Sequence, residues 1–177
     1  MMKASVCLLC TLWIVLSACI DNKPNQNASG QDELRSLELE NPIDKSSIAY
    51  RDTLYVPIYS DIYVDANNQN SMLAATLSIR NTSYTDSLYV SKIDYFDTNG
   101  TLVKSFIENT ISLTPMATVN YVIEKENDLG GPGANFIVCL SAKSDQVTPI
   151  VQAIMVGENG NKGFSFTASG QSIRNNN

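Results

Sequence analysis

The chain has 177 residues, with 12 Lys+Arg against 18 Asp+Glu, a formal net charge of −6 and no histidine. It lacks the dense basic cluster that neutralises phosphates, which excludes nucleic acid as a partner. The missing histidine removes Ser-His-Asp and Cys-His catalysis and the commonest zinc ligand sets. We therefore expect no catalytic residues, metal or cofactor, and an enzyme that uses carboxylates or a metal is the less favoured alternative.

The first residues predict a lipoprotein signal peptide over residues 1–18. Met1-Met2-Lys3 gives a positive start, and the apolar stretch Ala4–Leu16 is too short for a permanent membrane span. It ends in Leu16-Ser17-Ala18-Cys19, which resembles a bacterial lipobox. We expect cleavage before Cys19 and acylation of this residue, for example with palmitate, which anchors the mature chain to a membrane of the bacterial cell envelope, on its periplasmic or surface face. A plain signal peptide with a chance cysteine is the alternative.

The mature chain divides into a linker, one domain and a tail. Residues 19–46 are polar and lack aromatic residues beyond Cys19, which predicts a flexible linker. Residues 47–170 carry the folding signal, and the polar residues 171–177 predict a disordered tail. With the leader removed and Cys19 acylated, Cys139 has no partner for a disulfide, and we interpret it as a buried small hydrophobe.

The domain shows the two-residue periodicity of β-strands. Strands are expected over residues 54–63, 73–80, 88–96, 102–107, 118–124, 134–142 and 148–156 and around 164–166. Asn99-Gly100 favours a hairpin turn between the third and fourth of these. About eight short strands without a long helical pattern predict an all-β fold, an antiparallel β-sandwich with an immunoglobulin-like arrangement.

Three tyrosines in the first expected strand form a candidate binding surface. Tyr55, Tyr59 and Tyr63 share one strand face, which offers a stacking platform for a sugar or a peptide. Pro57 cannot donate to a strand ladder, so this strand lies at a sheet edge or crosses between sheets at the proline. Because aromatic residues are common in strands, packing is the favoured interpretation of the tyrosines.

A glycine-rich loop is the second candidate. Gly130, Gly131 and Gly133 surround a proline just before Asn135. A phosphate-binding loop opens a helix, whereas a strand is expected here, so a structural turn is favoured. If the chain has a loop site, this loop with Asn135 is the candidate, because flanking strands would hold it rigidly.

Several segments carry a resemblance to a known family. They are Leu73–Thr82, Asp94–Gly100 and Gly130–Phe136, together with Tyr55–Ser60 and Ile150–Met155. In these segments the chain resembles the bacterial family called domain of unknown function 3124. Members look like secreted or lipid-anchored proteins, so the resemblance implies one intact domain outside the cytoplasm. It implies no activity, substrate or catalytic residue.

These observations favour a lipid-anchored envelope protein that acts as a non-catalytic binding or scaffolding module. Its expected partners are the membrane, through Cys19, and an envelope protein or a glycan. The alternative is a small-ligand or glycan-binding domain that uses the tyrosines or the Gly130 loop.

Overall fold

The computed structural model describes residues 36–63, 70–125 and 129–173. Its elements are η1 (Lys45–Ser47), β1 (Tyr50–Pro57), β2 (Asp61–Tyr63), β3 (Asn70–Arg80), β4 (Leu88–Phe96), β5 (Leu102–Ser105), β6 (Ile111–Leu113), β7 (Thr118–Ile123), β8 (Asn135–Ala142), β9 (Ile150–Asn159), β10 (Lys162–Ser169) and β11 (Gln171–Ser172). Within these three segments, no helix has the length and hydropathy needed to cross a membrane. The leader, Cys19 and the first part of the predicted linker lie outside the described residues.

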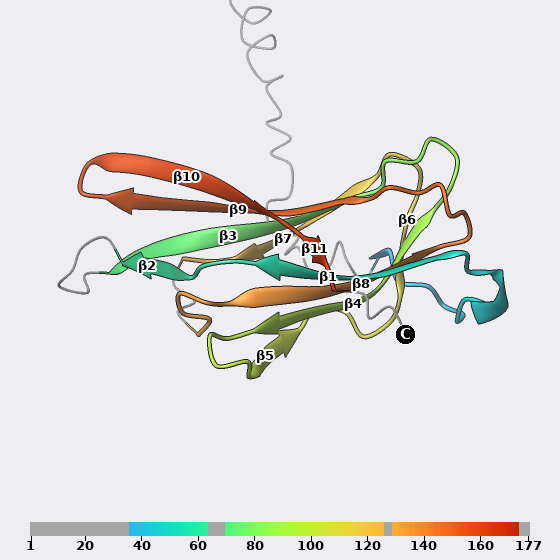
Figure 1. Cartoon of the computed structure of the whole chain (residues 1–177), viewed down its shortest axis with the longest axis horizontal. Helices are drawn as coiled ribbons and strands as arrows, with labels where there is room; N and C mark the ends of the chain where they lie inside the picture. The colour runs from blue at the N-terminus through green and yellow to red at the C-terminus, as the bar shows by residue number, and fades with distance from the viewer. Residues whose placement is uncertain (1–35, 64–69, 126–128, 174–177) are drawn as a thin grey trace, which may run out of the picture.

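The strands form two antiparallel sheets packed face to face, as predicted. The first sheet has the order β11-β1-β8-β4-β5, with β6 also paired to β4. The second has the order β10-β9-β3-β2, with β7 also paired to β3. Figure 1 shows the two layers, with β9, β10 and β3 above β1, β8 and β4. The predicted antiparallel β-sandwich is confirmed.

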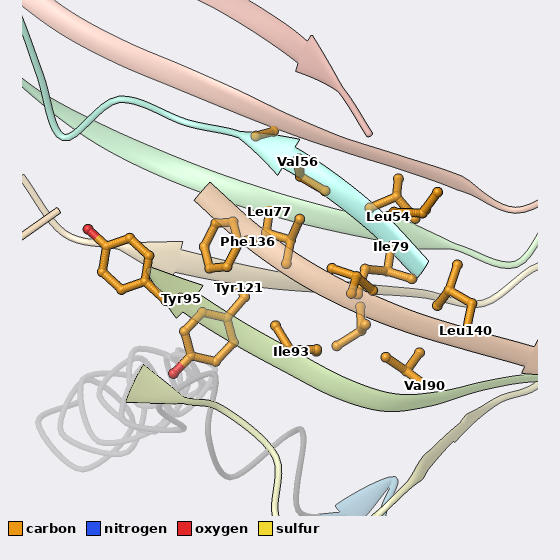
Figure 2. Packing of buried hydrophobic residues seen from close by; sticks show 14 of the residues in the cluster. Leu54, Val56, Leu77, Ile79, Val90, Ile93, Tyr95, Tyr121, Phe136 and Leu140 are labelled. Atoms are coloured by element: carbon orange, nitrogen blue, oxygen red, sulfur yellow. The ribbon is translucent and has the colours of Figure 1, made fainter. Parts of the chain in front are cut away.

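The core lies between the sheets and follows from strand alternation. Every second residue of β3, from Leu73 to Ile79, is buried, and Leu54 and Val56 of β1 face them from the other layer. Figure 2 shows Leu54, Val56, Leu77 and Ile79 in the core, with the ring of Phe136 next to Leu77 and the ring of Tyr95 next to Phe136. Burial of a Leu, Ile or Val side chain stabilises the fold by about 1.5–3 kcal/mol. The alternation of these residues along a strand therefore determines which of its two faces turns toward the core.

The first predicted strand is divided between the two sheets. β1 ends at Pro57 in the first sheet, and β2 begins at Asp61 in the second. Between them, the Ile58 amide donates to the Ala134 carbonyl over 2.9 Å. Of the two alternatives for Pro57, the structure therefore has the crossing between sheets, at the point where a ladder donor is missing.

The predicted hairpin joins β4 and β5. One carboxylate oxygen of Asp97 accepts the amide of Asn99 at 2.8 Å and that of Thr101 at 2.7 Å. Gly100 has φ +79°, the left-handed conformation that glycine adopts without strain. Local turn chemistry thus fixes the end of this strand pair, although β5 ends at Ser105, two residues before the expected Ile107.

The end of the predicted linker differs from expectation, because it is attached to the domain. The Leu39 amide donates to the Thr110 carbonyl at 2.8 Å, and the Ser112 amide donates to the Leu37 carbonyl at 3.0 Å. Leu37 also packs against the core cluster. Residues 37–39 therefore form an isolated β-bridge to the start of β6, since a leucine that can be buried and two backbone hydrogen bonds offset the entropy of ordering them.

The predicted disordered tail, residues 171–177, begins with residues that are ordered in the structure. Residues 171 and 172 form β11 beside β1, and the Ile173 amide donates to the Thr53 carbonyl at 2.8 Å. Ser172 donates to the Asp52 carboxylate at 2.6 Å. These polar residues are ordered because β1 offers them unpaired backbone groups, a property that their own composition does not reveal. Residues 174–177 lie outside the described residues.

Candidate functional site

The Gly130 loop is fastened to the β4–β5 turn by one threonine. The Thr98 amide and hydroxyl both donate to the Gly130 carbonyl at 2.9 Å. The same hydroxyl accepts the Gly133 amide at 2.9 Å. Gly131 has φ +71°, which requires glycine for an unstrained turn. The Gly130 carbonyl and the Gly133 amide of the loop thus form hydrogen bonds within the domain.

A buried polar pair lies directly under this loop. The hydroxyls of Ser60 and Tyr95 are 3.0 Å apart, and Tyr95 is fully buried. A Cβ atom on Gly130 would collide with both hydroxyls and with Ala134. Burial raises the pKa of Tyr95, the hydrogen bond to Ser60 lowers it in part, and the nearby Asp97 carboxylate raises it. The tyrosine therefore stays neutral at physiological pH and acts as a hydrogen-bonded support for the loop.

Asn135 completes the loop as the first residue of β8. It is only 9% exposed and lies in register with Pro57 on one side and Phe96 on the other. The contacts of Gly130, Gly131, Gly133 and Asn135 have the geometry of a structural turn. Ligand binding by this loop stays a prediction.

The structure does not join the three tyrosines into one stripe. Tyr55 lies on β1 in the first sheet and Tyr63 on β2 in the second, because the chain crosses between them. Tyr59, in the connection, packs edge-on against Phe166 of β10 with ring centroids 5.9 Å apart. Tyr59 and Tyr63 keep 37% and 58% of their surface exposed, so each offers a single ring rather than a continuous platform.

A groove on the outer face of the first sheet is the site that the sequence did not reveal. Its volume is about 380 Å³, and it lies between the sheet and the chain that enters β1. The lining residues are Pro42, Ile43, Lys45, Ile48, Arg51, Asp52, Thr53, Ser91, Thr110, Cys139, Leu140 and Ser141. The groove thus joins residues that are almost 100 positions apart in the chain.

Strand alternation shows which lining side chains face the groove. Leu54 and Leu140 are buried in the core, so Thr53 and Cys139 point to the opposite, outer face. The Thr53 hydroxyl and the Cys139 sulfur lie 3.8 Å apart. The expectation that Cys139 is a buried core residue is therefore corrected: it is half-buried and borders the groove. β8 is apolar on both faces, which hides from sequence which face is the inner one.

The charges around the groove are unequal. Arg51 donates to the Lys45 carbonyl at 2.9 Å and so holds η1 beside β1. The Asp52 carboxylate is occupied elsewhere, because it accepts the Thr53 amide at 2.9 Å and the Ser172 hydroxyl at 2.6 Å. Over the described part of the chain, neither Lys45 nor Arg51 has a carboxylate within ion-pair distance. The groove therefore has two cations beside several hydroxyl groups.

Comparison with known proteins identifies a family but no activity. The model of a family described as "Protein of unknown function (DUF3124)" matches residues 51–173. Among curated proteins, none matches the chain. The chain is similar to the protein in the crystal structure of Thermotoga maritima 1070, with 13% identity and a TM-score of 0.42, over 68% of this chain and 92% of that one.

Proposed function

The chain belongs to the DUF3124 family of proteins of unknown function, and from this premise we propose a non-catalytic binding module of the bacterial cell envelope. The groove is its binding site. This conclusion is carried by one observation, a hollow of about 380 Å³ on a rigid sheet, which is within the usual size of small-ligand sites, roughly 300–1,000 Å³. Strands β1, β8 and β4 fix its floor, and the entering chain forms one wall.

We propose further that Cys19 anchors the module to a membrane. The leader pattern before Cys19 supports acylation there, and acyl chains on one residue hold a domain at a membrane without a helical span. The chain that follows Cys19 leads to residues 37–48, which pair with the domain and border the groove. The same stretch of chain therefore connects the anchor and shapes the site.

A scaffolding role is the second candidate, supported by an edge strand. β10 pairs with β9 along eight residues, and the described residues place no strand on its other side. An extended segment of an envelope protein can add to such an edge through backbone hydrogen bonds. This form of the module would need no groove ligand.

Thermal melting of the chain from Ile20 to Asn177, which keeps every described residue, tests the proposal. The panel contains envelope glycans, peptidoglycan fragments, short peptides and small organic anions. A ligand at one hundred times its Kd stabilises by about 2.7 kcal/mol, which raises Tm by several degrees for a domain of this size. We expect at least one class to do so.

Two tryptophan variants show whether such a ligand uses the groove. Ser141→Trp fills the groove and should abolish the rise in Tm. Ser165→Trp, on the exposed side of β10, is the matched control and should retain it. A cooperative melt that no ligand shifts contradicts the groove proposal and favours the scaffold form.

A further inference from the structure

We propose that the groove binds a small organic oxyanion, a carboxylate or phosphate group carried on a compact apolar body. This inference rests on the proposed function, because it names the ligand class for the same groove. The cations, hydroxyl groups and apolar side chains that line the groove support it.

The charged side chains that face the groove are both cationic. Arg51 lies on the outer face of β1, since its neighbours along the strand alternate between faces and Leu54 is in the core. Lys45 lines the groove from the entering chain. By the same alternation Asp52 belongs to the inner face, where Ser172 and its own neighbour's amide hold its carboxylate. A groove with two cations on a chain of net charge −6 favours an anionic ligand.

Hydroxyl groups supply further donors for an oxyanion. Ser91, Thr110 and Ser141 line the groove, and their hydroxyls form no hydrogen bond to any residue that the structure describes. Each hydroxyl has one proton to donate, and the Arg51 guanidinium matches the planar carboxylate group. Charge-assisted hydrogen bonds of this kind are about twice as strong as neutral ones.

The apolar side chains select the rest of the ligand. Pro42, Ile43 and Ile48 border the groove on the side of the entering chain, opposite the hydroxyls of the sheet. A free inorganic ion would leave this surface exposed, whereas an anion with a short hydrocarbon body covers it and gains about 25 cal/mol for each Å² removed from water. A neutral sugar would leave both cations without a charge partner.

Protection of the Cys139 thiol measures occupancy of the groove directly. The full chain, expressed with its leader and purified in detergent, is labelled with iodoacetamide, a neutral reagent that the cations neither attract nor repel. Cys139→Ser gives the background from other thiols. The probes are hexanoate and hexyl phosphate, with hexanamide as the uncharged match and hexylammonium as the cation. At ten times its Kd, a bound probe should slow the labelling about elevenfold.

Glutamine variants test the two cations. Lys45→Gln and Arg51→Gln should each raise the Kd for hexanoate or hexyl phosphate about tenfold, the loss expected for one charge-assisted contact, so that the same probe concentration slows labelling only about twofold. Lys162→Gln, an exposed lysine on β10, is the matched control and should protect as well as the original chain. The melting temperature of each variant shows that the fold persists.

The outcomes separate this inference from the proposed function. The inference is supported if either anion protects Cys139 more strongly than hexanamide does and if this protection weakens in both glutamine variants. The anion that protects more strongly identifies the headgroup. If neither anion protects better than hexanamide, or if hexylammonium protects better than both anions, the anionic ligand class is overturned and the groove remains a binding site. If none of the four probes protects Cys139, the oxyanion inference is wrong, and the melting panel decides independently whether the groove binds anything.

Discussion

Gly130 occupies a position where no side chain fits. Its missing Cβ makes room for the paired hydroxyls of Tyr95 and Ser60 beneath the loop. Gly130→Ala should therefore destabilise the protein by about 2 kcal/mol or more, because a well-packed site does not accept an added methyl group. Urea unfolding measures the loss. Gly163→Ala is the matched control, since an added Cβ there meets only one atom, at 3.9 Å, and its expected change is within about 0.5 kcal/mol.

Tyr95 gives the fold a dependence on alkaline pH. Its pKa is raised by burial, so above about pH 10 the unfolded chain releases the phenol proton while the folded chain retains it. The folded state then binds more protons, and the stability contributed by neutral Tyr95 is lost as pH rises.

Tyr95→Phe removes this titration. Below pH 9 the variant should be about 1 kcal/mol less stable, the usual value of one hydrogen bond such as that to Ser60. The difference from the original chain should shrink as pH rises above 10, in unfolding curves recorded across that range. A constant difference would show that Tyr95 ionises equally in both states.

Among the elements, the last described segment, β11, is a strand of the first sheet. β11 and Ile173 supply a hydrogen bond to Asp52 and one to the Thr53 carbonyl. A chain that ends at Gly170 should lose about 2 kcal/mol or more, because the pairing of β11 with β1 and the hydrogen bonds to the Asp52 carboxylate and the Thr53 carbonyl are removed. A chain that ends at Ile173 is the control and should unfold at the original urea concentration. Equal stability of the two truncated chains would show that residues 171–173 contribute nothing to the fold, as the predicted disordered tail implies.

The strands were predicted well where the signal is local. The hairpin of β4 and β5 depends on alternation and on Asp97 and Gly100, all within a short stretch. The attachment of Leu37 and the pairing of Ser172 depend on partners that are about 70 and 120 residues away. A polar segment without its own periodicity gives no sign that such a partner exists, so these ends were missed.

The candidate site was less predictable than the fold. The predicted stacking platform of Tyr55, Tyr59 and Tyr63 requires one unbroken strand. The crossing after Pro57 divides this strand between the two sheets. The groove forms only where η1, β1, β4 and β8 come together. In the sequence, its serines and threonines look like any polar residues on the solvent-facing side of a strand. The alternation of Arg51 and Thr53 with the apolar Leu54 indicates that both side chains point away from the core. Alternation cannot show that the chain entering β1 covers this outer face.

In the whole molecule, the proposed anchor at Cys19 would hold the domain and its groove at a membrane. Cys19→Ser should abolish incorporation of an alkyne-labelled palmitate analogue into the full chain in growing cells, because the thiol that carries the lipid is gone. Cys139→Ser, which also removes one thiol, is the matched control and should be labelled normally. Label retained in Cys19→Ser would contradict anchoring at this residue.

Amide chemical-shift mapping shows whether a ligand occupies the groove or another part of the domain. The chain from Ile20 to Asn177, labelled with nitrogen-15, is titrated with hexanoate and with any ligand that raises Tm. If the groove is the binding site, we expect saturable shifts at Arg51, Thr53, Cys139 and Ser141, with β9 and β10 unchanged. Shifts centred on the Gly130 loop or on Tyr59, or no saturable shift with any ligand, would contradict it.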